Sequence, residues 1–197
     1  LIVGVFQLTL PRITENKRIA LEQAIFEVLP GAVTKQAYAV DGASITPLEE
    51  GIKAPTQIYA GYDDAGKLVG VAIEGAAMGY ADVIRALYGY SLEKQCAIGM
   101  TVLESKETPG LGDKISKDEK FQSNFDGLQM QLNESRDGLT EVVKGKKSGT
   151  KENPWEIDGI TGATISSVAM GKLINESGQV LVPVVMKERA TLEAGGS

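Results

Sequence analysis

The order of the hydrophobic patterns along the chain limits its fold more than any other sequence feature. An amphipathic pattern over residues 11–29 predicts a helix, which begins at Pro11 or Thr14 and stops at Pro30 and Gly31. Five β-rich segments follow it, and helical patterns return near the C-terminal end. Helix first, then a run of strands, then helices is typical of an α+β domain with a mainly antiparallel, twisted sheet flanked by helices.

Short β-rich segments separated by turn residues make up the predicted sheet. The turn sequence Asp63-Asp64-Ala65-Gly66 predicts a hairpin between the second and third of these segments. The five predicted strands cover residues 35–40, 57–62, 67–74, 82–90 and 95–103.

The second half of the chain alternates irregular and regular patterns. Residues 107–112 contain too much Gly and Pro for a regular element and predict a shaped loop. A capping box of Ser116 and Glu119 then predicts a helix over residues 116–125. The remaining predictions are strands at 128–132 and 139–144, an exposed turn at 145–150, a helix at 165–176 with Gly178 near its end, and a helix at 179–189 that is kinked or begun near Pro183.

The composition excludes several classes of function. Hydrophobic residues form 43% of the chain and charged residues 23%, which are ordinary values for one globular domain of 197 residues. The net charge of −6 argues against a nucleic-acid partner, because a surface that follows phosphates carries a basic excess. A chain without histidine has no imidazole base, no histidine haem ligand and no histidine-containing zinc motif.

The single cysteine, Cys96, rules out an intramolecular disulfide and a cysteine-rich metal site. It lies within the predicted strand at 95–103, where it is most simply a small buried residue rather than a reactive thiol. We therefore predict no metal centre and no cysteine catalysis.

Two segments at the chain ends fall outside a predicted single domain of residues 11–191. Residues 1–6 are apolar and fit two interpretations equally. One is the trailing end of a removed membrane anchor, which would leave residues 1–10 as its remnant, and the other is a short buried strand. Residues 192–197 predict a flexible tail or a scar of cloning.

Three short motifs are rejected because their structural requirements are not met. Residues 110–115 begin like a dinucleotide fingerprint, but Ile115 occupies the last glycine position and no βαβ unit surrounds them. Residues 145–150 resemble a phosphate loop but lack the glycine that must precede its Gly-Lys-Ser/Thr end. The glycosylation sequons at Asn133 and Asn175 are too short a pattern to indicate a role.

Two segments have the composition of a ligand site. In residues 107–112, Pro109 fixes a turn while Gly110 and Gly112 leave room for a flat ligand against the backbone. Residues 158–164 place glycine, small residues and hydroxyls at a predicted helix start, where free N–H groups favour an anion such as phosphate. Taken separately, each segment is better explained as an ordinary turn or helix cap.

Taken together, the two segments resemble the FMN-binding domain shared by the G subunit of the Rnf electron-transport complex and the C subunit of the sodium-pumping NADH:quinone oxidoreductase. The flavinylation pattern of that family is Asp, two variable residues, Ser or Thr, Gly or Ser, then Ala-Thr. Every position of it is matched here, by Asp158, Thr161, Gly162, Ala163 and Thr164.

The resemblance covers nearly the whole chain. Residues 107–112 match the second family motif, residues 75–80 resemble its glycine-rich segment beside the flavin, and residues 9–16 and 29–31 resemble its start. Ser105 departs from the pattern, because many members have histidine there. That departure removes the basis for a proton-coupled role of this position.

The resemblance implies that Thr164 carries FMN through a phosphoester to the ribityl phosphate. A separate flavin transferase, which uses FAD and a divalent metal, would install it, and Asp158 would help that enzyme to recognise the loop. Contacts from residues 107–112 would chiefly set the reduction potential of the flavin. The implied cofactor-binding residues are Thr164, Glu107, Thr108, Gly110, Leu111, Gly112, Thr161, Gly162, Ala163 and Tyr80.

The resemblance also implies a setting for the protein. It would be an electron-relay subunit of a membrane ion-translocating oxidoreductase, held by an N-terminal helix on the extracytoplasmic side, with the other subunits as partners. The alternative is a scaffold, or a module that binds FMN noncovalently. A freestanding FMN-binding reductase would need a nicotinamide site, and the sequence contains no motif for one.

Overall fold

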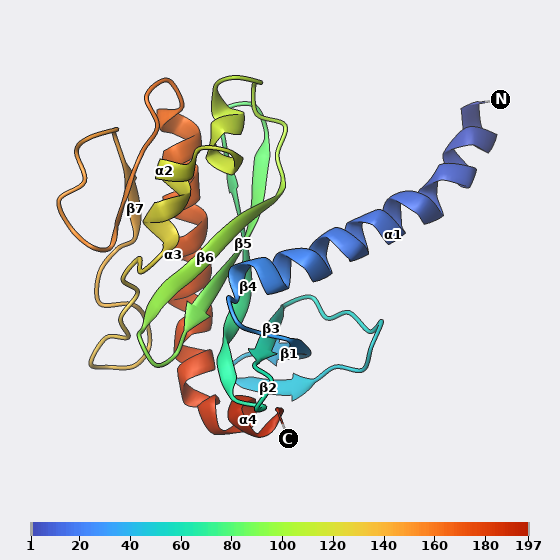
Figure 1. Ribbon diagram of the computed structural model, residues 1–197, viewed down its shortest axis with the longest axis vertical. Coiled ribbons are helices and arrows are strands. Elements are labelled where there is room, and N and C mark those ends of the chain that lie inside the picture. The colour runs from blue at the N-terminus through green and yellow to red at the C-terminus, as the bar shows by residue number, and fades with distance from the viewer. Residues whose placement is uncertain (1, 197) are drawn as a thin grey trace.

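An antiparallel sheet of six strands forms the centre of the molecule (Figure 1). The computed structural model describes residues 2–196, with backbone only for residues 2–11. The strand order in the main sheet is β2-β1-β3-β4-β5-β6. The strands are β1 (Thr34–Asp41), β2 (Ser44–Pro47), β3 (Gln57–Tyr62), β4 (Leu68–Met78), β5 (Val83–Ser91), β6 (Cys96–Glu104), β7 (Lys144–Lys146) and β8 (Glu156–Asp158). The helices are α1 (Ile2–Val28), α2 (Glu119–Gln122), α3 (Thr164–Lys187) and α4 (Arg189–Ala194), with 3-10 turns η1 (Gly112–Ser116) and η2 (Ser123–Phe125).

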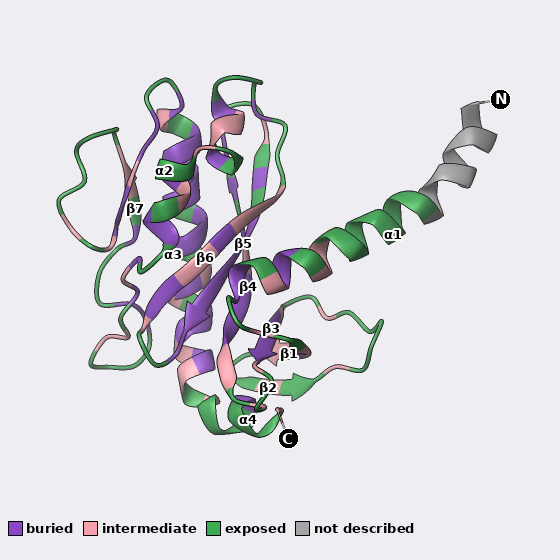
Figure 2. Cartoon of the chain, viewed as in Figure 1, coloured by how far each residue is buried: buried purple, intermediate pink, exposed green. Residues whose placement is uncertain are grey.

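The two faces of the sheet carry different helices. Because side chains alternate along a strand, Ile58 and Ala60 of β3 lie in the core under α3, while Tyr59 between them lies in a smaller core under α1. The C-terminal turn of α1 contributes Ile25 and Val28 to that smaller core. Figure 2 shows the resulting buried band through the sheet and the inner side of α3. The prediction of an α+β fold with a mainly antiparallel sheet flanked by helices is confirmed.

The predicted strands match β1, β3, β4, β5 and β6 to within a few residues. The predicted hairpin between β3 and β4 is also present: the Asp63 carboxylate accepts from the backbone N–H of Ala65 at 3.0 Å and of Lys67 at 2.8 Å. Sequence patterns missed β2, a four-residue strand at the sheet edge, because so short a segment carries no periodicity. Cys96 is buried as predicted.

Helix α1 is longer than the pattern at 11–29 predicts. It begins at Ile2, so the interpretation of residues 1–6 as a buried strand is wrong for residues 2–6, while residue 1 lies outside the described residues. Residues 12–20 are exposed, and Figure 1 shows this half projecting away from the body of the molecule. Where α1 does pack, it lies very close to the sheet, since a Cβ on Gly89 would stand 1.9 Å from the Val28 carbonyl oxygen. Within residues 2–196 no helix is long and apolar enough to span a bilayer.

Several predictions for the region between the sheet and α3 are wrong. The helix expected at 116–125 is split into η1, α2 and η2, and its N-cap is Asp118, whose carboxylate accepts from Phe121 N–H at 2.8 Å. Apart from Lys144, which begins β7, the strands expected at 128–132 and 139–144 reduce to isolated bridges, Cys96 with Gln129 and Leu132 with Leu139. The exposed turn expected at 145–150 begins as part of β7, which pairs with β8 in parallel.

The C-terminal segment is also more ordered than predicted. Helix α3 runs without a break through Pro183 to Lys187, so residues 165–176 and 179–187 belong to one helix rather than two, and Arg189 already begins α4. The flexible tail predicted at 192–197 is wrong for the described residues, because α4 extends to Ala194 and Leu192 is fully buried. The Tyr62 hydroxyl donates to the Leu192 carbonyl at 2.6 Å and ties α4 to the sheet.

Candidate functional site

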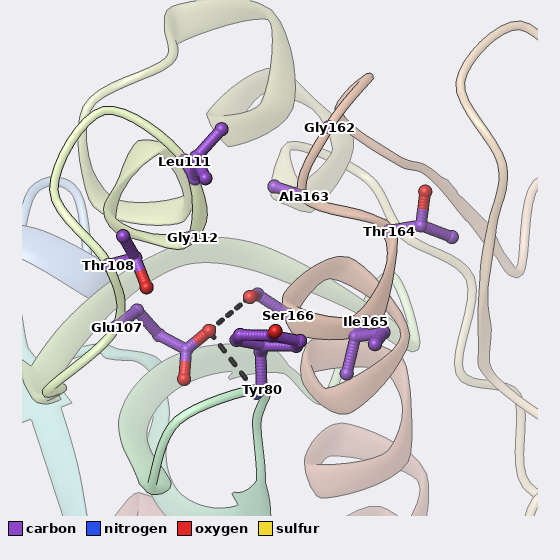
Figure 3. A pocket seen from close by; sticks show the side chains of 10 residues that line it. All are labelled: Tyr80, Glu107, Thr108, Leu111, Gly112, Gly162, Ala163, Thr164, Ile165 and Ser166. Atoms are coloured by element: carbon purple, nitrogen blue, oxygen red, sulfur yellow. Dashed lines mark hydrogen bonds between the residues drawn. The ribbon is translucent and has the colours of Figure 1, made fainter.

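Three segments that are far apart in the sequence enclose a cavity of about 410 Å³ at the start of α3. The segments are the turn between β4 and β5, the loop at 107–112, and the first turn of α3 with the residues before it. We call it the α3 cavity, and Figure 3 shows its lining. The lining residues are Tyr80, Glu107, Thr108, Leu111, Gly112, Gly162, Ala163, Thr164, Ile165 and Ser166.

The turn before α3 has a fixed backbone conformation. Gly162 has a φ of 83°, a left-handed value that an L side chain rarely adopts. Ala163 N–H donates to the Ile160 carbonyl at 3.0 Å and closes the turn. The buried Ser167 hydroxyl donates to the Ala163 carbonyl at 2.9 Å and accepts from Ile160 N–H at 3.0 Å. Ser167, one turn into the helix, therefore sets where residues 160–163 lie.

Close backbone packing holds this turn against the rest of the molecule. A Cβ on Gly159 would stand 2.2 Å from the Lys146 carbonyl oxygen, and one on Gly171 would stand 2.2 Å from the Gly145 nitrogen. A side chain at Gly145 or Gly171 would force β7 away from α3, and one at Gly159 would force the end of β8 away from β7. We call these three glycines, 145, 159 and 171, the glycine seam.

The N-terminus of α3 is open to an anion. Ala163 occupies the N-cap position, has no side-chain hydrogen bond, and leaves the first N–H groups of the helix without a side-chain cap. No acidic residue lies in the first turn. Thr164 is the first helical residue and is half-buried, with its side chain on the outer side of the helix start in Figure 3. This end of the helix attracts negative charge through its backbone dipoles.

Large apolar side chains stand around the α3 cavity without being covered. Tyr80 is 69% exposed, Leu111 49% and Ile165 54%. Such residues are expected in a binding site, because an apolar ligand would remove their surface from water. Figure 3 places Tyr80 and Ile165 on one side of the cavity and Leu111 on the other.

Glu107 lies at the base of the α3 cavity and is only 6% exposed. Its carboxylate accepts from Ala81 N–H at 2.9 Å. It also accepts from Tyr80 N–H at 3.3 Å and from the Ser166 hydroxyl, the two hydrogen bonds drawn in Figure 3. Burial raises the pKa of this carboxyl, but the hydrogen bonds from Ser166 and from the Tyr80 and Ala81 backbone outweigh it and leave the pKa below its ordinary value. The carboxylate is therefore ionised at neutral pH.

Most of the residues proposed from the sequence come together at this place. Tyr80, from the glycine-rich segment 75–80, joins residues of the two motifs in the α3 cavity. Ile165 and Ser166 also line it, although sequence reasoning treated them only as helix residues. The one signal for them in the sequence was their position directly after Thr164.

Three of the proposed residues do not line the α3 cavity. Gly110, with a φ of 77°, shapes the loop behind it, and Thr161 lies with Asp158 in a separate hollow of about 300 Å³. One Asp158 oxygen accepts from Gly149 N–H at 2.6 Å, and the other lies 3.5 Å from the Lys120 ammonium. In this structure Asp158 therefore joins the 147–150 turn to the loop that precedes α3.

Ser105, the departure from the family pattern, also has a structural contact. Its hydroxyl accepts from Glu107 N–H at 3.2 Å at the start of the loop. Among residues 2–196 no group of three or more acidic or cysteine side chains is arranged to hold a metal ion.

Known proteins resemble this chain across the segments that form the α3 cavity. The profile of the FMN-binding domain matches residues 79–178, which include both motifs and all residues that line the cavity. The chain belongs to the FMN-binding domain family. The family expected from the two motifs is thereby confirmed.

Relatives of this FMN-binding domain protein are subunits of ion-translocating complexes. The chain is 35% identical over 158 residues to the G subunit of the Na⁺-translocating ferredoxin:NAD⁺ oxidoreductase complex of Acetobacterium woodii, covering 78% of this chain and 70% of that protein. It is 30% identical to the G subunit of the ion-translocating oxidoreductase complex of Methanosarcina acetivorans, covering 76% and 68%.

Two solved structures share the fold. NqrC of Shewanella oneidensis superposes with a TM-score of 0.64 at 16% identity, covering 92% of this chain and 98% of that one. The C subunit of the Na⁺-translocating NADH-quinone reductase of Parabacteroides distasonis gives 0.67 at 20% identity, covering 88% and 96%. At these identities the likeness establishes the fold alone.

Proposed function

We propose that this protein is the electron-transfer G subunit of an ion-translocating oxidoreductase complex, and that it carries FMN as a phosphoester on Thr164. The observation that carries the proposal is the hydroxyl of Thr164 at the uncapped start of α3, beside a cavity with exposed apolar walls. Family membership supports FMN as the cofactor.

The residues present fit both ends of FMN. The first N–H groups of α3 suit a phosphate, because the N-cap is an alanine and no acidic side chain repels the charge within the first turn. Tyr80, Leu111 and Ile165 offer apolar surface to a flat ring system in the α3 cavity. When bound, FMN supplies the capacity to accept and release electrons.

In the proposed attachment reaction, FAD donates its FMN part to Thr164. The Thr164 oxygen forms a bond to the phosphorus on the riboflavin side, the bond from that phosphorus to the bridging oxygen of the diphosphate breaks, and AMP leaves. The hydroxyl proton passes to a base of the transferase. Thr164 suits this role because it is the first residue of a helix and is only half-buried, so a modifying enzyme can approach it.

The wider setting is carried over from the family. We propose that the protein passes electrons between the other subunits of its complex, that the FMN-binding domain begins near residue 11 and includes α4, and that a membrane anchor holds it on the extracytoplasmic side. The chain itself then needs to position a cofactor rather than to perform acid–base chemistry, which agrees with the absence of histidine.

Intact-mass measurement after coexpression with a flavin transferase tests the proposal. We expect an increment of one FMN, less one water, in the wild type and in Thr164→Ser, which keeps a hydroxyl. Thr164→Ala should lack it, because it has no oxygen to form the ester. An increment that persists in Thr164→Ala would reject the assignment. A wild type with unchanged mass and yellow colour lost on denaturation would favour the noncovalent alternative.

A further inference from the structure

The Glu107 carboxylate joins all three segments that form the α3 cavity. It belongs to the loop at 107–112, accepts hydrogen bonds from Tyr80 and Ala81 in the turn between β4 and β5, and accepts another from Ser166 in the first turn of α3. These donors come from positions 26 to 59 residues away in the sequence. Among the described residues that line the cavity, no other side chain makes hydrogen bonds to both of the other segments.

Two glycines leave the space that this carboxylate occupies. A Cβ on Gly79 would stand 2.6 Å from one Glu107 oxygen, and a Cβ on Gly112 would stand 2.5 Å from the other. Burial of a charge without compensation is costly, so a site that supplies a hydroxyl, two N–H groups and two glycines to one carboxylate is built for the ionised form.

The charge of Glu107 is not balanced by a cation. Among the ion pairs of residues 2–196 none involves Glu107, and its hydrogen bonds come from neutral donors. The charged groups nearest in the chain pair with one another, Lys106 with Asp82 at 2.9 Å and Lys117 with Asp113 at 2.6 Å. Lys114 lines the separate hollow beside Asp158, and the first turn of α3 has no acidic or basic residue to offset the charge.

We infer that Glu107 is a positioning residue that holds the walls of the α3 cavity together and keeps a fixed negative charge in its base, so that it lowers the reduction potential of the flavin bound there. The inference rests on the proposed function. In mildly alkaline buffer, reduction adds two electrons and one proton to the flavin, which becomes more negative by one charge. A fixed negative charge nearby opposes that change.

Two measurements test the two parts of this inference. Hydrogen exchange at the Tyr80 and Ala81 amides of the flavin-free protein reports the hydrogen bonds to Glu107. The ratio of reduced to oxidised flavin, measured in flavin-loaded protein with dithionite and mediators at one applied potential, reports the charge. The variants are Glu107→Gln, which removes the charge, and Ser166→Ala, which keeps the charge but removes one donor. Glu104→Gln is the control, because Glu104 is an exposed carboxylate at the end of β6, three residues before Glu107.

We expect Glu107→Gln to speed exchange at Tyr80 and Ala81 and to raise the ratio of reduced to oxidised flavin about tenfold. Ser166→Ala should speed exchange but change the ratio less than about twofold, since the charge remains. Glu104→Gln should change neither. If Glu107→Gln does not fold, Glu107→Asp replaces it. We expect that variant to show faster exchange at the Tyr80 and Ala81 amides and the same ratio of reduced to oxidised flavin as the wild type.

Unchanged exchange in Glu107→Gln would overturn the positioning role, and an unchanged or lowered ratio would overturn the role of the charge. If transferase does not load the wild type, the ratio is measured on protein reconstituted with free FMN. A wild type that takes FMN in neither form would overturn the proposed function and the role of the charge together. The exchange measurement would then still decide the positioning role.

Discussion

At the scale of single residues, the α3 cavity depends on side-chain atoms that are absent as well as on those that are present. Ala163 has no oxygen with which to cap α3, and Gly79 and Gly112 have no Cβ to displace the Glu107 carboxylate. The polar groups that face this carboxylate are the Ser166 hydroxyl and backbone N–H groups. At this scale the site is sensitive to single added carbon atoms.

Gly112→Ala should destabilise the protein although alanine is a small residue. Its Cβ would stand 2.5 Å from a Glu107 oxygen and 2.7 Å from the Ser166 oxygen, and all of these groups are buried. We expect a loss of about 1–3 kcal/mol in the free energy of unfolding, measured by urea denaturation. Leu111→Ala is the matched control: its side chain is 49% exposed, so it should cost much less. Equal losses in the two variants would contradict this packing.

At the scale of elements, the start of α3 is placed by β7 and β8 rather than by the main sheet alone. The glycine seam brings the backbone of β7 against the helix and the end of β8 against β7, and Ser167 holds the turn that leads from β8 into α3. Only three residues long each, β7 and β8 depend on this packing for their stability.

Two glycines of α3 offer a matched comparison. In Gly171→Ala the new Cβ would meet backbone, 2.2 Å from the Gly145 nitrogen, whereas in Gly178→Ala it would meet the movable end of the Met130 side chain at 2.6 Å. Thermal denaturation should show a loss of at least about 2 kcal/mol for Gly171→Ala. Gly178→Ala should stay within about 1 kcal/mol of the wild type, because alanine favours the helix. A larger loss of stability in Gly178→Ala than in Gly171→Ala would show that the glycine seam is not closely packed.

Ser167→Ala should loosen the turn before α3. The change leaves Ile160 N–H without its acceptor and removes a hydrogen bond to the Ala163 carbonyl, both in a buried place. We expect a loss of about 1–2 kcal/mol in the free energy of unfolding. Val168→Ala, at an exposed neighbouring position of the same helix, serves as the control and should change stability by less than about 0.5 kcal/mol. A Ser167→Ala variant as stable as this control would show that the turn does not depend on the hydroxyl.

On the scale of the whole molecule, buried carboxylates make stability depend on pH in acid. Hydrogen bonding from Glu152 N–H, opposed by burial and supported by Asn153 and Lys146, lowers the pKa of Glu156 from 4.5 to about 2. The pKa of Glu107 is lowered as well. A lowered folded-state pKa means that the stabilisation is complete above the unfolded value and is lost as pH falls through the folded value.

The melting temperature should therefore fall as pH drops from 4.5 towards 2, the window set by Glu156. Glu156→Gln should be less stable than the wild type at neutral pH and should lose less on acidification, because the titrating group is gone. Differential scanning calorimetry at a series of pH values measures both effects. Glu141→Gln, which changes an exposed carboxylate, should keep the wild-type profile. An unaltered acid profile in Glu156→Gln would place the titrating groups elsewhere.

The sequence predicted the elements that have a clear period and the residues that belong to clear motifs. The packed part of α1 was predictable because it buries one face at helical spacing, and strands β3 to β6 were predictable because they are short apolar runs bounded by turn residues. The region from 112 to 158 was not, because its helices and strands are three to five residues long and have no period of their own. The burial of Leu192 was missed because a leucine in a Gly-rich terminal segment is typical of a flexible tail. Its burial depends on distant contacts such as the hydrogen bond from the Tyr62 hydroxyl to its carbonyl.

The sequence by itself determined the fold class, the family and the two motifs, because hydrophobic period and motif spacing are local properties of the chain. Only the tertiary structure decided that Tyr80, the 107–112 loop and the start of α3 share one cavity, that Asp158 and Thr161 face another hollow, and that Glu107 joins three segments. The physical reason is that burial of a carboxylate and the meeting of backbone at glycines depend on distances between segments far apart in the chain, as Glu107 and Ser166 are at a separation of 59 residues.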